Sequence, residues 1–253
     1  MSREEVIAGE TSNSDVSQET SRWYDRYYAK KGALRNSLLR NPEVMFQSLA
    51  AEMSITQALA SIDVDAGTAQ VLDVGCGDGS SLIHFLKLGF VPTQLSGIDI
   101  LKTRVEEARL KLPGSQLTVG DAANVPYPDE TFDVVFESTM FVQLTDETLA
   151  RRIAAEMLRV TKVGGHLLLS DWRYSKPGNE EYVGLSTKRI GRLFHDGAAT
   201  DIVGFHAGAL VPPIGRYLSK RAGSLYFMLR RALPLLVGQR VAVISKRPLQ
   251  KAA

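Results

Sequence analysis

The 253-residue chain has a single cysteine, Cys76, and lacks any continuous apolar run of the about 18 residues that a membrane-spanning helix needs. One cysteine excludes an internal disulfide, which fits a reducing compartment. The first ten residues contain acids where a secretory signal peptide would have a basic patch followed by an apolar run. We therefore expect a cytoplasmic globular protein, and a hydrophobic content of 44% is ordinary for that class.

Acidic residues are absent from the last 52 residues, although the formal net charge of the whole chain is only +2. Residues 1–201 carry 28 acidic and 21 basic residues, a formal charge of −7, whereas residues 202–253 carry nine cations. The near-neutral total and the lack of a recognised binding module argue against a nucleic-acid partner. The basic segment instead favours an anionic small-molecule or glycan ligand, or peripheral contact with the inner face of an anionic membrane.

The first 60 residues divide into two predicted parts. Residues 1–20 are rich in Ser, Thr, Glu and Asn without apolar periodicity, so we expect a disordered tail. Residues 21–60 are predicted to form a helical lid, because aromatic residues recur at helical spacing and Asn41-Pro42 is typical of a helix start. The aromatic residues are Trp23, Tyr24, Tyr27 and Tyr28. The alternative is that these rings pack on the core of the remaining domain, residues 61–253.

Short apolar segments alternate with helical patterns along that domain, which indicates crossover connections and a largely parallel sheet. The predicted strands are 71–75, 95–100, 116–122, 133–138, 166–172, 201–207 and 240–246. The fold class is therefore α/β, with a seven-stranded, mostly parallel sheet and helices on both faces.

Two of the predicted helices have visible limits. One follows residue 144, where Thr145 is expected to cap it and Gly164-Gly165 to end it. Its buried stripe is Leu149, Ile153, Met157 and Val160. The other is a basic helical insert at about 208–238, between the last two strands. Its apolar face is predicted as Ile214, Leu218, Ala222, Leu225 and Leu229, with Arg216, Lys220, Arg230 and Arg231 pointing elsewhere.

A glycine-rich turn, DVGCGDG at 73–79, follows the first predicted strand and precedes a helix. Glycine at such a turn lets the backbone approach a ligand closely. The G-x-G-x-G spacing differs from the dinucleotide G-x-G-x-x-G pattern, so an NAD(P)-dependent oxidoreductase is the less favoured interpretation. Asp99 ends the next strand 20 residues after Gly79, where a carboxylate commonly binds ribose hydroxyls. A purely structural tight turn remains an alternative.

These motifs resemble those of the class I S-adenosylmethionine (SAM)-dependent methyltransferases. The resemblance spans about 100 residues and implies a Rossmann-like domain that binds SAM. It rests on VLDVGCGDGS (71–80), SGIDI (96–100), GDAANVPYPDETFDVV (120–135) and LRVTKVGGHLLLSDW (158–172).

The resemblance also implies roles for individual residues. Asp73, Gly75 and Gly77 would hold the methionine end of SAM, and Cys76 would contribute its backbone. Asp99 would bind the ribose, with Ile100 beside the adenine. Asp121 would bond the adenine amino group, with Ala122 alongside. Glu137 would contact cofactor or substrate, and Tyr28 would belong to a lid over the cofactor. Structural roles remain open for Asp121 and Glu137.

The acceptor side of the site is predicted at the carboxyl end of the strand at 166–172, because open α/β sheets bind ligands there. Asp171 is the leading candidate for a general base, and His195 and His206 are further candidates. The loop SDWRYSKPGN (170–179) offers Trp172, Arg173, Tyr174 and Asn179 for acceptor binding. This loop also resembles, more loosely, type-11 methyltransferases encoded with bacterial surface-polysaccharide genes. An ordinary surface loop is the alternative.

The sequence therefore predicts a SAM-dependent methyltransferase acting on a small-molecule or glycan acceptor, with oxygen favoured as the attacking atom. No residue is assigned as a metal ligand, and a metal requirement does not follow from the sequence. A catalytically silent SAM-binding scaffold that associates with a membrane or partner is the alternative from another class, because cofactor motifs report binding and not turnover. The identity of the acceptor and the oligomeric state do not follow from the sequence.

Overall fold

A computed structural model describes residues 22, 26, 37–195 and 199–248 of the chain. The predicted disordered tail and the aromatic part of the predicted lid, including Tyr28, lie outside the described residues.

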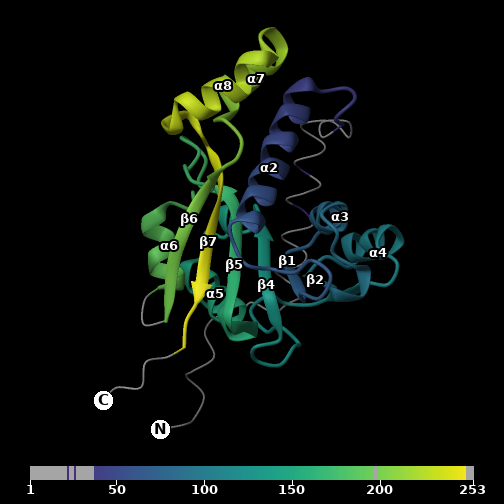
Figure 1. Ribbon diagram of the computed structural model, residues 1–253. Helices are drawn as coiled ribbons and strands as arrows, with labels where there is room; N and C mark the ends of the chain where they lie inside the picture. The colour runs from purple at the N-terminus through teal and green to yellow at the C-terminus, as the bar shows by residue number, and fades with distance from the viewer. Residues whose placement is uncertain (1–21, 23–25, 27–36, 196–198, 249–253) are drawn as a thin grey trace.

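The structure is built on one seven-stranded sheet with the strand order β3-β2-β1-β4-β5-β7-β6 (Figure 1). Strand β7 runs antiparallel to both of its neighbours, and the other neighbouring pairs are parallel. The strands are β1 (Val71–Val74), β2 (Leu95–Asp99), β3 (Gln116–Val119), β4 (Phe132–Ser138), β5 (Thr161–Trp172), β6 (Thr200–Ala207) and β7 (Gln239–Lys246). The predicted α/β fold with a mostly parallel sheet is confirmed.

Helices cover both faces of this sheet. One face packs against α5 (Glu147–Val160) and α6 (Thr187–Phe194). The other packs against α2 (Pro42–Ala60), α3 (Ser80–Lys87) and α4 (Lys102–Lys111). Because both faces of the sheet are covered, inner strands such as β1 are buried at every position rather than at alternate positions. Three short 3₁₀ turns are η1 (Pro92–Gln94), η2 (Phe141–Gln143) and η3 (Pro234–Leu236).

The limits of α5 differ from those predicted. Asp146, rather than Thr145, is the N-cap, and its side chain accepts from the backbone N–H groups of Thr148 and Leu149. The helix ends at Val160, and Gly164-Gly165 lie inside β5 instead of ending the helix. The pairing of β4 with β5 shifts register between Phe132 and Val134, where the strand passes these glycines.

The segment between β6 and β7 forms two helices, α7 (Pro212–Arg221) and α8 (Gly223–Ala232), not one. The backbone breaks at Ala222, and Gly223 lies so close to the Phe46 ring that a Cβ atom there would meet Phe46 Cζ at 2.6 Å. The predicted continuous apolar face is therefore wrong, and Leu225 is exposed. Arg230 is also not on an outer face, because it is buried and its Nε donates to the Gly208 carbonyl at 2.9 Å.

Helices α7 and α8 lie with α2 at one end of the molecule (Figure 1). This is the end toward which the parallel strands point, since β7, which runs the opposite way, leads away from it (Figure 1). Among the described helices, none combines the length and apolar character needed to cross a membrane.

Candidate active site

The glycine-rich turn leaves the carboxyl end of β1 and folds over the end of β2. The N–H groups of Gly75 and Cys76 both donate to the Ile98 carbonyl, at 2.8 and 3.0 Å. Gly75, Gly77 and Gly79 have positive φ angles of 76°, 51° and 78°, a conformation that costs other L-residues about 1 kcal/mol or more. A Cβ atom at Gly77 would meet nothing within 4 Å, so this part of the turn faces open space.

Asp73, on β1, is a buried carboxyl group. The residue is 1% exposed, and among the described residues neither of its carboxyl oxygens has a hydrogen-bond partner. Burial, with a smaller contribution from the charge of Asp99, raises the pKa of Asp73 to about 8. A buried carboxyl group without a hydrogen bond is unfavourable, and a cationic ligand group would relieve that state. Asp73 is therefore the strongest indication of a ligand at this end of the sheet.

Asp99 ends β2 and connects the glycine turn to the next loop. One of its carboxyl oxygens accepts from Gly77 N–H at 2.9 Å, and the other accepts from Leu101 N–H at 2.8 Å. Burial raises its pKa, although these two hydrogen bonds oppose the shift. Ile100 follows directly, and its place beside the adenine stays a prediction. The structure thus brings Asp73, the glycine turn and Asp99 together at the carboxyl ends of β1 and β2.

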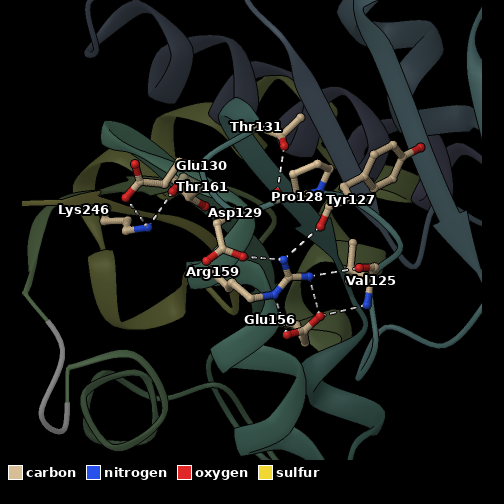
Figure 2. A network of polar contacts seen from close by, with 10 residues as sticks. All are labelled: Val125, Tyr127, Pro128, Asp129, Glu130, Thr131, Glu156, Arg159, Thr161 and Lys246. Atoms are coloured by element: carbon tan, nitrogen blue, oxygen red, sulfur yellow. Dashed lines mark hydrogen bonds and ion pairs between the residues drawn. The ribbon is translucent and has the colours of Figure 1, made fainter.

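The loop after β3 carries two further residues that are predicted to lie against the adenine. Asp121 accepts from the Ala123 N–H at 2.8 Å, and Ala122 packs against the core. Arg159 on α5 holds the rest of this loop, as Figure 2 shows. Its guanidinium donates to the carbonyls of Val125 and Tyr127 and to the carboxylates of Asp129 and Glu156, all at 2.8–2.9 Å.

The segment after β4, residues 139–144, packs against the glycine turn. A Cβ atom at Gly75 would lie 3.2 Å from Met140 Sδ. Two buried acids hold this segment: Glu137 accepts from Met140 N–H at 3.1 Å, and Asp171 accepts from Val142 N–H at 2.7 Å. Burial raises the pKa of both carboxyl groups, and the Asp171 charge raises that of Glu137 further. The second oxygen of Glu137 has no hydrogen-bond partner within residues 37–195 and 199–248.

Arg189, on α6, completes this buried network. It is 1% exposed, and its Nε donates to the Glu147 carboxylate at 2.7 Å. Its terminal nitrogens donate to the carbonyls of Phe141, Val183 and Leu144, at 2.6–2.8 Å. One buried cation therefore holds the segment after β4 at two of its carbonyl groups, those of Phe141 and Leu144.

The loop after β5 is built differently from the polar acceptor platform that was predicted. Trp172 packs in the apolar cluster with α2, α7 and α8. Arg173 lies over the Tyr174 ring at 4.5 Å, and the Tyr174 hydroxyl donates to the Leu235 carbonyl at 2.9 Å. Asn179 accepts from the Glu181 N–H and so supports a local turn. These contacts join the loop to η3.

The two predicted catalytic histidines do not lie with the cofactor residues. His195 caps the C-terminus of α6. Its ring bonds Thr200 at the start of β6, so it lies at the amino ends of the parallel strands, whereas Asp73 is near their carboxyl ends. His206 is on the edge strand β6, three strands from β4, and its ring bonds Ser61 at 3.1 Å. Asp171 is at the predicted edge, but it is 2% exposed and both oxygens accept backbone N–H groups.

Comparison with known proteins agrees with this geometry. A family profile described as a methyltransferase domain matches residues 71–165, which include the glycine turn, Asp99, Asp121 and Glu137. The chain carries a class I SAM-dependent methyltransferase domain.

Part of the chain is also similar to parts of curated relatives. The phthiotriol/phenolphthiotriol dimycocerosates methyltransferase of Mycobacterium tuberculosis H37Rv is 35% identical over 122 residues, which cover 46% of this chain and 42% of the relative. The demethylmenaquinone methyltransferase of Deinococcus radiodurans is 32% identical over 145 residues, covering 51% and 58%. The chain thus spans about half the length of the curated relatives it matches.

The fold has neighbours among solved structures. The [4+2]-cyclase SpnF superposes with a TM-score of 0.63 at 17% identity, covering 95% of this chain and 98% of that one. At this low sequence identity, the structural similarity establishes a shared fold but not a shared activity. The looser resemblance of the methyltransferase domain to proteins encoded with surface-polysaccharide genes stays a prediction.

Arg189 and Arg159 were not identified from the sequence, although both position the site. Their partners are mostly backbone carbonyls, 6 to 48 residues away for Arg189 and 32 to 34 residues away for Arg159. Helix periodicity offered one signal, because Arg189 falls on the same face of α6 as the buried Ile190, Leu193 and Phe194. A cation on an apolar helix face can indicate a buried polar network.

Replacing Arg189 tests that network. Arg189→Met removes the cation and leaves the Glu147 carboxylate and three carbonyls without their donor, so we expect a loss of about 3–5 kcal/mol in unfolding free energy. Urea denaturation measures it. Arg192→Met, an exposed change on the same helix, is the control and should cost less than about 0.5 kcal/mol. Equal stability of the two variants would contradict the structural role.

Asp73 gives a pH-dependent prediction. Its folded pKa of about 8 lies above the ordinary value of 3.8, so between these values the unfolded chain ionises first and folding stability falls as pH rises. Asp73→Asn lacks this titration. Its stability relative to wild type should therefore rise by up to ~4 kcal/mol from pH 5 to pH 8 in the absence of ligand.

Urea denaturation at several pH values measures this difference. Asp63→Asn, at an exposed position, should follow the wild-type profile. Parallel profiles for wild type and Asp73→Asn would show that Asp73 ionises normally in the folded protein.

Proposed function

We propose that this protein is a SAM-dependent methyltransferase whose acceptor is an amphiphilic small molecule bearing a hydroxyl group. The observation that carries the cofactor part of the proposal is Asp73, a buried carboxyl group beside the glycine turn that has no hydrogen-bond partner in the described part of the chain. The ammonium group of the methionine end of SAM is the cation that this carboxyl group lacks.

The remaining residues at this edge suit the other parts of the cofactor. Each oxygen of Asp99 accepts one backbone N–H and keeps a lone pair for a ribose hydroxyl. Asp121, held by its contact to Ala123, is placed to bond the adenine amino group, with Ala122 beside it. When bound, SAM supplies an activated methyl group on a sulfonium, and the protein needs to add little covalent chemistry.

The chain's own contribution is positioning and exclusion of water. We propose that Asp171 acts as a positioning residue, because both of its oxygens already hold backbone N–H groups. With Glu137 and Arg189 it fixes residues 139–144 against Gly75. The free oxygen of Glu137 is the better candidate to meet a ligand in this region.

The acceptor part of the proposal rests on the relatives and on the loop after β5. The two relatives named above act, by their names, on a dimycocerosate lipid and on a menaquinone precursor. The side chains of Trp172 and Tyr174 are committed to apolar packing and to η3 rather than to a sugar-binding platform. We therefore favour a lipid or quinol acceptor over a glycan, and a hydroxyl oxygen as the attacking atom.

A SAM-binding protein that does not transfer a methyl group is the second candidate. It is favoured by one observation, the fold shared with a [4+2]-cyclase. Release of S-adenosylhomocysteine separates the two, because only methyl transfer produces it.

Two glycine-to-alanine variants, one at the site and one as a control, test the cofactor site. Gly77→Ala adds a methyl group to the open side of the turn, and Gly164→Ala places the same group at a similar positive φ angle, 83°, near the start of β5 with equally open space. Both should lose about 1–2 kcal/mol of stability from backbone strain. Only Gly77→Ala should weaken binding of SAM and S-adenosylhomocysteine in calorimetry, by at least about tenfold.

Wild-type protein that binds neither compound would refute the cofactor assignment. Methyl transfer from radiolabelled SAM, screened against quinols, lipid alcohols, phenols and sugars, then tests the acceptor. Transfer to sugars alone would overturn the amphiphile proposal and leave the methyltransferase proposal intact.

A further inference from the structure

The outer side of α8 and η3 is apolar. The inner side of α8 is packed, because the rings of Tyr226 and Phe227 lie 5.5 and 6.0 Å from that of Phe46 on α2. Apolar side chains nevertheless point outward, and Leu235 is 77% and Met228 56% exposed. Leu225 and Leu233 are exposed beside them. We call this outer surface of Leu225, Met228, Leu233 and Leu235 the apolar ridge.

Cations accompany the apolar ridge, and the chain segment that forms α7, α8 and η3 has no acidic residue of its own. Residues 208–238 contain no Asp or Glu. Arg231 is exposed on α8, and Arg216 and Arg221 are exposed on α7, together with Tyr217. Lys220 is already paired with Glu43 at 3.3 Å and is not counted. The end of the molecule formed by α7, α8 and η3 thus exposes both large apolar side chains and positively charged side chains.

The apolar ridge is bonded to the loop that follows β5. Tyr174 donates to the carbonyl of Leu235, and Arg173 N–H donates to the carbonyl of Gly238 at 2.8 Å. Trp172 packs in the same cluster as α7 and α8. The ridge therefore lies directly beside the carboxyl end of β5, the edge of the sheet that holds Asp171 and its neighbours.

We propose that α7, α8 and η3 dock on an anionic lipid bilayer, with the apolar ridge inserted among the headgroups and Arg216, Arg221 and Arg231 meeting the lipid phosphates. Interfacial protein segments combine apolar side chains and cations in this way. A second copy of the chain fits less well, since a two-fold interface would bring the same cations against each other without an acid between them.

Docking would present the carboxyl edge of β5 to the bilayer. This last step rests on the proposed function, because it implies that the acceptor is taken from the membrane. The docking itself does not depend on it.

Sedimentation of the full-length protein with vesicles tests the docking. The probes are vesicles of equal parts phosphatidylglycerol and phosphatidylcholine, compared with vesicles of phosphatidylcholine alone. We expect binding to the anionic vesicles that weakens as salt is added. The double variants Met228→Ser/Leu235→Ser and Arg216→Glu/Arg231→Glu should each reduce partitioning at least tenfold.

Matched controls lie on other parts of the surface. Leu110→Ser removes an 86% exposed leucine from α4, and Arg152→Glu/Arg192→Glu reverses two exposed cations on α5 and α6. Both should bind vesicles like wild type. Failure of wild type to bind at low salt, or an equal loss in the controls, would overturn the proposal.

Two further measurements separate the explanations. Sedimentation velocity that shows a dimer dispersed by Met228→Ser/Leu235→Ser would identify the ridge as a self-association surface and overturn lipid docking. Calorimetry with SAM should give wild-type affinity for all four variants. Vesicle binding without SAM binding would refute the proposed function alone, and SAM binding without vesicle binding would refute the docking alone.

Discussion

A buried arginine facing two buried carboxyl groups sets the geometry of the site. Arg189 bonds the carbonyls of Phe141 and Leu144, while Glu137 and Asp171 accept the N–H groups of Met140 and Val142. Donors and acceptors of one short segment are thus held from both sides. Removing charge from water is unfavourable unless every group finds a partner, so this arrangement permits few alternative positions for the segment. Met140 in turn limits the space beside Gly75, which couples the network to the glycine turn.

The cofactor-binding residues could be predicted because they belong to motifs that are local in the sequence. A strand, a turn with glycines and a carboxylate after the next strand are adjacent in sequence, and parallel pairing of β1 with β2 brings their ends to one edge. Arg189 and Arg230 could not be predicted in this way. Their partners are carbonyls on other elements, and a carbonyl has no residue-specific signature. The position predicted for His195 was wrong for a related reason. The direction of α6 decides whether His195 lies at the carboxyl or the amino ends of the strands, and the sequence does not show that direction.

The insert shows how one close contact redirects a sequence pattern. The apolar spacing from Ile214 to Leu229 predicts a single amphipathic helix, but Gly223 lies against Phe46 and the backbone turns at Ala222. After the turn, the buried side of α8 is formed by Tyr226 and Arg230. Leu225 and Met228 consequently face outward, although periodicity alone had assigned Leu225 to the packed side. The apolar ridge is therefore a product of tertiary packing and is not visible in the periodicity.

The uneven distribution of charge along the chain indicates which kind of partner the apolar ridge binds. The formal charge of +2 treats every carboxyl group as ionised. Burial raises the pKa of Asp73 to about 8 and also raises those of Glu137 and Asp171, so these groups carry less negative charge near neutral pH than the count assigns. Arg230 is buried too, yet an arginine keeps its charge. Burial therefore removes negative charge from the acidic part and none from the basic part. The raised pKa values weaken the negative charge around the ligand-free site, and the acid-free segment around α7 and α8 is where an anionic surface meets the least repulsion.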